Sequence, residues 1–275
     1  MSAGAAAGSA HPSSAGIETL FAQERKGNGT GDGVPLVLLH GFGGDHTGWL
    51  SIVSRLSKDV ATLAYDLPGH GRSLNVPGAG RAGAMSKGVL ADLDARGVTR
   101  FHLCGHSMGG AVATLMAMRA PDRVASLTLL GPGGFGPEIA IDVLRDWGRA
   151  TSTTALSRAL RRMTAPGHVF GAFEIGRLEA MRRRPGQREK LVEITTLLAD
   201  EDGRQGAIDR EAIRSLSVPT TLVWGDRDPV LPASQADGLD DVYHVLRLQG
   251  AGHMLMEERP AAVARALKER IAAEL

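Results

Sequence analysis

At 275 residues, the chain is long enough for one large α/β domain with a sizeable hydrophobic core, with or without an inserted subdomain. The 31 basic residues balance the 30 acidic ones, so nothing in the net charge of +1 favours nucleic acid or an anionic membrane, and we expect small-molecule partners. The single cysteine excludes an internal disulfide and no apolar run approaches the roughly 18 residues of a membrane span, which together predict a cytoplasmic protein.

The amino-terminal stretch differs in composition from the rest of the chain. Residues 1–16 are mostly Ala, Gly, Ser and Pro and contain no Lys or Arg, so they lack both the basic and the apolar region of a signal peptide. We expect a disordered tail there.

Strand-like and helix-like segments then alternate, which predicts a mostly parallel sheet with helices on both faces. Apolar runs bounded by turn residues predict strands near residues 16–25, 34–40, 60–66, 99–104 and 124–130. Helical patterns lie near 45–57, 84–96 and from 108 onward. Near the carboxyl terminus, the same patterns predict strands at 218–224 and 242–248, and helices at 233–239 and from about 259. Glu257 and Glu258, just before Pro260, fit ordinary helix-start chemistry.

This alternation stops in the middle of the chain. Residues 134–215 show helical patterns near 138–150, 153–163 and 170–199 and no strand, so we expect a helical cap inserted into a core of residues 17–133 and 216–275. The insertion is rich in arginine between Arg158 and Lys190. These arginines fit a solvated helical face, and the alternative is that one of them reaches an anionic group of the substrate.

The most informative stretch is Gly105-His-Ser-Met-Gly109, which breaks an apolar run before helical spacing resumes. G-x-S-x-G between a strand and a helix is typical of a nucleophile elbow, in which glycines allow a strained turn that exposes the serine hydroxyl. The helix amino terminus after the turn favours negative charge on the group under attack. Ser107 is therefore the candidate nucleophile. It needs a general base, and a third group that fixes the tautomer of that base.

Five motifs in this order resemble the α/β-hydrolase superfamily, over roughly residues 17–273. They are His40-Gly-Phe-Gly, Asp66-Leu-Pro-Gly-His-Gly-Arg-Ser73, Gly105-His-Ser-Met-Gly-Gly110, Trp224-Gly-Asp-Arg-Asp-Pro-Val-Leu-Pro232 and Gly250-Ala-Gly-His253. The resemblance implies an α/β-hydrolase fold with Ser107, Asp228 and His253 as the catalytic triad. Asp226 is the alternative acid, although the spacing favours Asp228 and leaves Asp226 as a turn residue.

The same resemblance assigns roles to other residues near the predicted strand ends. The backbone N–H groups of Phe42 and Met108 would form the oxyanion hole. His40, His70 and His106 would orient backbone, and Asp66 would hold its own glycine-rich loop in shape. Cys104 fits a buried strand position without chemistry.

The function predicted from these residues is hydrolysis of a small ester, thioester or activated carbonyl such as a diketone. The pattern is most similar to the hydrolase-like domain of acetoin dehydrogenase acetyltransferase-type subunits, without the lipoyl domain. Carbon–carbon bond hydrolysis of the meta-cleavage-product type, acyl transfer and perhydrolase activity are alternatives on the same triad. A slow-turnover ligand receptor is the alternative from another class. The sequence has no metal-site pattern, so we expect no cofactor.

Overall fold

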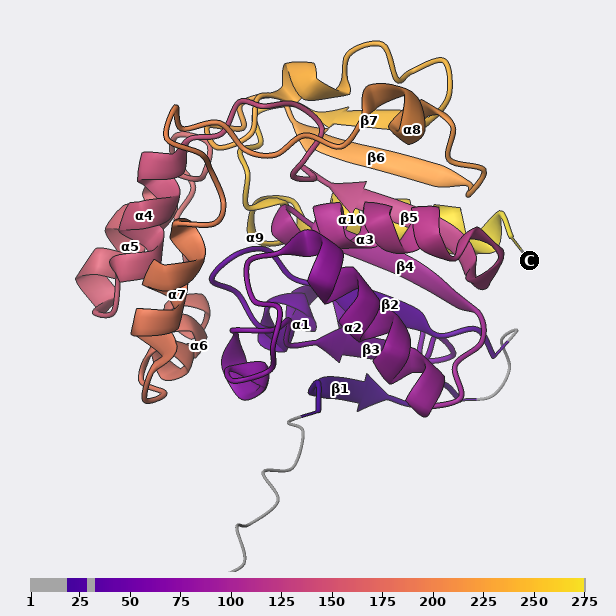
Figure 1. The fold of residues 1–275 in the computed structure, drawn as a ribbon, viewed down its shortest axis with the longest axis horizontal. Coiled ribbons are helices and arrows are strands. Elements are labelled where there is room, and N and C mark those ends of the chain that lie inside the picture. Colours follow the sequence, from indigo (N-terminus) through magenta and orange to yellow (C-terminus); the bar gives the residue numbers. More distant parts are fainter. Residues whose placement is uncertain (1–18, 29–32, 275) are drawn as a thin grey trace, which may run out of the picture.

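The computed structural model of the protein describes residues 19–28 and 33–274. The predicted disordered tail at 1–16 lies outside these ranges. Seven strands form one sheet in the order β1-β3-β2-β4-β5-β6-β7, in which β1 is antiparallel to β3 and the other neighbours are parallel (Figure 1). The strands are β1 (Ala22–Arg25), β2 (Leu36–Leu39), β3 (Thr62–Tyr65), β4 (Phe101–His106), β5 (Val124–Leu130), β6 (Thr220–Gly225) and β7 (His244–Leu248).

Helices cover both faces of this sheet, with α2 and α3 on one side and α1, α9 and α10 on the other (Figure 1). The α-helices are α1 (Leu50–Val53), α2 (Ala82–Ala95), α3 (Met108–Arg119), α4 (Ile141–Arg149), α5 (Thr153–Arg161), α6 (Ala172–Arg182), α7 (Gln187–Thr195), α8 (Arg210–Arg214), α9 (Leu255–Glu258) and α10 (Pro260–Ala272). The architecture confirms the predicted α/β-hydrolase fold. None of the helices in the described part of the chain could cross a membrane, being too short or too polar.

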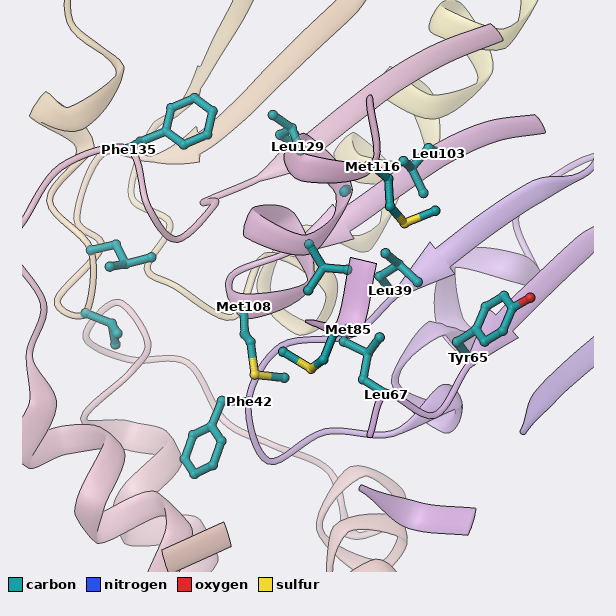
Figure 2. Close-up of a cluster of buried hydrophobic side chains, with 14 of the residues drawn as sticks. Leu39, Phe42, Tyr65, Leu67, Met85, Leu103, Met108, Met116, Leu129 and Phe135 are labelled. Atoms are coloured by element: carbon teal, nitrogen blue, oxygen red, sulfur yellow. The ribbon is translucent and has the colours of Figure 1, made fainter. Parts of the chain in front are cut away.

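The central strands are buried on both faces, so their apolar residues fill two hydrophobic clusters. On β2, Val37 and Leu39 belong to the cluster under α2 and α3, whereas Leu36 and Leu38 belong to the cluster under α1 and α10. This is the two-residue alternation of a strand between two helical layers. Figure 2 shows the first cluster, in which leucines of β2, β4 and β5 lie beside Met116 of α3.

Several predicted helices differ from the observed ones. The helix expected over 45–57 is a 3-10 turn at His46–Trp49 followed by the single α-turn α1, and the one expected over 233–239 is a 3-10 turn at Ala233–Ala236. The pattern at 170–199 forms two helices, α6 and α7, because Pro185 lacks a backbone N–H and Gly186 adopts a φ of 81° between them.

Two short helices, α8 and α9, are absent from the predictions, since a turn of four or five residues carries too little periodicity. The segment between β5 and β6 is helical without a strand, as predicted, and α4 to α7 stand as a group at one end of the sheet (Figure 1).

Candidate active site

The turn between β4 and α3 holds Ser107 in an unusual backbone conformation. Its φ of 52° makes it the one non-glycine residue with a positive φ in the described ranges. Such a conformation costs on the order of 1–3 kcal/mol and persists only where the surroundings enforce it. A Cβ on Gly105 would lie 2.2 Å from the carbonyl oxygen of Gly109, and one on Gly109 would lie 2.3 Å from that of Leu39. Both glycines are therefore required for α3 to pack this closely on the sheet.

A hydrogen-bonded chain connects the three side chains of the sequence hypothesis. The Ser107 hydroxyl lies 3.0 Å from Nε2 of His253, and Nδ1 of His253 lies 2.7 Å from Oδ2 of Asp228. The acidic partner fixes the proton on Nδ1, which leaves Nε2 free to accept the serine proton. All three side chains are buried, although they come from three separate loops after β4, β6 and β7.

The two candidate acids have different surroundings. The second oxygen of Asp228 accepts hydrogen bonds from the backbone N–H groups of Val230 (2.8 Å) and Leu231 (2.9 Å), which fixes the carboxylate toward the imidazole. Asp226 is exposed and accepts from the N–H of Gly250 at 2.7 Å. Asp226 therefore stabilises the turn at Gly250, and of the two acids only Asp228 contacts the ring of His253.

Two cavities meet at Ser107. The larger has a volume of about 340 Å³ and a mainly apolar wall that includes Phe42, Met108, Leu144, Ile208 and Val230. Phe42 and Met108 lie at the end of the core that faces the helical segment (Figure 2). Met108 is the first residue of α3, so its N–H has no acceptor within the helix and is free to face a ligand. The second cavity, of about 30 Å³, also contacts His253 and extends to Arg177 and Glu257.

Three histidines support the loops around the site. Nε2 of His40 accepts from the N–H of Leu67 at 2.9 Å, and Nε2 of His70 accepts from that of Gly43 at 3.1 Å. Nε2 of His106 donates to the carbonyl of His253 at 2.9 Å. Burial lowers the pKa of His40, and it lowers the pKa values of His70 and His106 to about 3, so all three are neutral at pH 7.

Asp66 organises the loop after β3. Its carboxylate accepts from the N–H of His46 (2.7 Å), from Nδ1 of the same residue (2.7 Å) and from the N–H of Arg72 (2.8 Å). Burial alone would raise the pKa of Asp66, but these hydrogen bonds together hold it below its ordinary value. The same contact raises the pKa of His46, against the opposing effect of burial. Asp66 therefore holds its loop, and the structure does not bring it to Ser107.

Pro260 begins α10, as predicted, but Glu257 and Glu258 lie in α9 with buried side chains, so they are not the ordinary helix-start acids that the sequence indicated. Oε2 of Glu258 accepts from the N–H groups of Ala165 and Gly252 at 2.9 Å each, and its Oε1 accepts from that of Met254 at 3.1 Å. Glu258 thus ties the loop that carries His253 to the helical segment. The only feature of the sequence that could have indicated this contact is the position of Glu258, five residues after His253.

The arginine-rich stretch contains both exposed and buried side chains. Most of its basic side chains are exposed, as expected for a solvated face, but Arg177 and Arg182 are not. Arg182 donates to the carbonyl of Gly43 at 2.9 Å and to that of Ala150 at 3.2 Å, and burial lowers its pKa to about 9. Trp147 donates to the carbonyl of Phe42 at 2.9 Å. Helices α4 and α6 are therefore bonded directly to the loop after β2.

Comparison with known proteins identifies the fold family. Residues 36–266 match the alpha/beta hydrolase family. The chain belongs to this family. Its relatives include proteins named as hydrolases and as acetyltransferase components.

One relative is the dihydrolipoyllysine-residue acetyltransferase component of an acetoin cleaving system from Pseudomonas putida. It is 37% identical over 228 residues, which are 82% of this chain and 60% of the relative. The matching component from Cupriavidus necator is 30% identical, and the chain spans 64% of its length. The predicted resemblance to such components is confirmed, while the chain spans less than two thirds of their length.

Two further similar proteins are hydrolases by name. A 2-hydroxy-6-oxononadienedioate/2-hydroxy-6-oxononatrienedioate hydrolase from a Pseudomonas species is 31% identical over 74% of each chain. The structure of a meta-cleavage product hydrolase from Pseudomonas fluorescens superposes with a TM-score of 0.80 at 20% identity, covering 93% of this chain and 95% of that one. This last likeness shows the fold alone.

Proposed function

We propose that the protein is a serine hydrolase that cleaves a small ester, thioester or activated carbonyl compound, with Ser107, His253 and Asp228 as its catalytic triad. The observation that carries the proposal is the continuous chain of hydrogen bonds from hydroxyl to imidazole to carboxylate, at 3.0 and 2.7 Å. A serine hydroxyl is a weak nucleophile, and a base at this distance with a fixed tautomer is what activates it.

In the proposed reaction, Oγ of Ser107 attacks the substrate carbonyl while Nε2 of His253 takes the hydroxyl proton. The carbonyl π electrons move to the oxygen, which the N–H groups of Phe42 and Met108 would stabilise. When the tetrahedral intermediate collapses, the bond to the leaving group breaks and the imidazolium returns its proton to that group. Water then repeats both steps on the acyl-serine, which releases the acid and regenerates the hydroxyl.

We further propose that residues 134–215 act as a cap over a core of residues 17–133 and 216–275. Support comes from the hydrogen bonds of Trp147 and Arg182 to the loop after β2, and from the contact of the His253 N–H with the carbonyl of Met163 at 2.8 Å. A cap in this place would exclude water and choose the substrate. The apolar wall of the larger cavity favours a hydrocarbon part of the substrate there.

The test is a substrate panel of p-nitrophenyl esters, acyl thioesters and β-diketones against the wild type and Ser107→Ala. Removing the nucleophile should lower kcat/KM for every processed class by about 10⁴-fold or more. A fluorophosphonate probe should label the wild type, and Ser54→Ala, an exposed serine away from both cavities, serves as the matched control that labels equally. Labelling that persists in Ser107→Ala would refute the assignment of the nucleophile.

The panel also separates the alternatives. Turnover of acyl thioesters with transfer to an added thiol would favour acyl transfer, in line with the relative from the acetoin cleaving system. Turnover of β-diketones but not esters would favour carbon–carbon hydrolysis, the reaction class of the meta-cleavage relatives' names. Folded protein that neither turns over substrate nor reacts with the probe would instead favour a ligand receptor.

A further inference from the structure

The smaller cavity at Ser107 has a polar end built by the helical segment and the carboxyl-terminal part of the chain together. It shares Ser107 and His253 with the proposed triad, and its lining also includes Arg177 of α6 and Glu257 of α9. Its volume of about 30 Å³ leaves room for only a few non-hydrogen atoms beyond the serine. A group bound there must therefore be small.

The polar end is an ion pair with one free oxygen. Nη2 of Arg177 donates to Oε1 of Glu257 at 2.6 Å, and the two side chains are only 10% and 5% exposed. Oε2 of Glu257 is buried and has no hydrogen-bond partner among the residues that the structure describes. A buried acceptor without a partner costs about 1–3 kcal/mol, and more when it is charged. A donor from a bound molecule would recover that cost.

The charge of the pair decides which donor fits. Glu257 already balances Arg177, so the cavity offers no net positive charge to a carboxylated substrate, and the free oxygen would repel one. A cationic donor would in turn meet the guanidinium. An uncharged hydroxyl satisfies the free oxygen without either penalty, and it is small enough for the space.

We propose that the smaller cavity selects substrates that carry an uncharged hydroxyl group on the smaller side of the scissile carbonyl, and that Oε2 of Glu257 accepts the hydrogen bond from that hydroxyl. This inference rests on the proposed serine hydrolase function and names its substrate class. Glu257 is then a specificity-determining residue. This proposal replaces the alternative that an arginine of the 158–190 stretch holds an anionic group of the substrate. Arg177 orients Glu257 and does not itself hold an anionic substrate group.

The experiment compares esters that differ only at the group facing the small cavity. One set is 2-hydroxyethyl, propyl and carboxymethyl hexanoate, and the reverse set is hexyl 3-hydroxypropanoate, hexyl butanoate and hexyl hydrogen succinate. In at least one set the wild type should prefer the hydroxylated ester over the methyl analogue by roughly 10- to 100-fold in kcat/KM, as expected for a hydrogen bond to a charged acceptor. The carboxylated ester should be the poorest substrate of that set.

Substitution of the acceptor then tests its role. In Glu257→Gln, the ratio of hydroxylated to methyl ester should fall by about tenfold or more, and the carboxylated ester should gain relative to both because Arg177 is no longer neutralised. Glu257→Asp, which keeps the carboxylate, should retain part of the preference. Glu189→Gln, an exposed acid on α7, is the matched control and should leave the ratios unchanged.

The outcomes distinguish this inference from the function on which it rests. Hydrolysis of the esters with no preference for the hydroxyl in either set would overturn the inference and leave the hydrolase proposal standing. A preference that Glu257→Gln leaves intact would overturn the assignment to Glu257. No turnover of any member by folded wild-type protein would count against the hydrolase function itself. Because the wild-type ratios already discriminate, the test holds even where one variant fails to fold.

Discussion

Glu258 links the stability of the protein to the position of the proposed general base. Its carboxylate accepts three backbone N–H groups, from Ala165, Gly252 and Met254, and the last two flank His253. In Glu258→Gln the amide oxygen can still accept, but the amide NH₂ cannot. At least one N–H group therefore loses its acceptor, and the remaining hydrogen bonds lose their charge.

The cost follows from these contacts. One charge-assisted hydrogen bond lost, with its donor left unpaired, costs about 1.5–3 kcal/mol, and losing the charge on the other two weakens each by about 1 kcal/mol. We therefore expect Glu258→Gln to lower the free energy of unfolding by about 3–5 kcal/mol. For a domain of this size, each kcal/mol corresponds to a fall in Tm of about 2–4 °C. Because the loop then holds the imidazole less firmly, kcat/KM should fall by at least about tenfold.

Urea unfolding followed by circular dichroism measures the first effect, and hydrolysis of p-nitrophenyl esters measures the second. Glu269→Gln, an exposed acid on α10, is the matched control and should change the free energy of unfolding by no more than about 0.5 kcal/mol. If Glu258→Gln matches that control in both stability and kcat/KM, the three hydrogen bonds do not have the importance assigned to them.

Three further predictions concern other buried groups. Asp66→Asn should destabilise the fold by about 3–5 kcal/mol in urea titrations, since it leaves His46 without its buried acidic partner. The pKa of His106 is about 3 when folded and ordinarily 6.5, so between these two pH values the unfolded state binds one more proton than the folded state. The free energy of unfolding of the wild type should therefore fall by about 1.4 kcal/mol from this group for each pH unit between 6.5 and about 3, and His106→Gln should remove that share of the slope. Gly109→Ala should yield little folded protein in expression and thermal-melt assays, because its Cβ would lie 2.3 Å from the carbonyl oxygen of Leu39.

Features encoded by neighbouring residues were predictable from the sequence. The strand over 124–130 has the predicted bounds, and the other strands lie within one to three residues of theirs at most ends, because buried parallel strands appear as short apolar runs between turn residues. The first strand is the exception, since β1 begins only at Ala22. The elbow was equally visible, since only glycine fits positions 105 and 109. Whether Ser107 acts as the nucleophile stays a prediction.

Features that depend on distant segments were not predictable in the same way. Glu258 precedes a helix in a pattern typical of exposed acids, and its burial follows from Ala165, a residue 93 positions away. Arg177 and Glu257 each look like ordinary surface charges, and only the fold brings these two side chains, 80 positions apart, into an ion pair. A sequence pattern indicates which face of one helix or strand is buried. The roles of Glu258 and of the Arg177–Glu257 pair depend instead on contacts between segments that are distant in the sequence.

Four buried histidines lie around the site, and their hydrogen-bond partners distinguish them. His40 and His70 each accept from a backbone N–H, and His106 donates to a backbone carbonyl, so each has a ring nitrogen committed to holding a loop. Burial also keeps these three rings neutral. His253 alone of the four has a carboxylate on one nitrogen and a serine hydroxyl on the other. The hydroxyl can pass its proton to Nε2 while the carboxylate accepts from Nδ1, which is why we assign proton transfer to His253 and loop support to the rest.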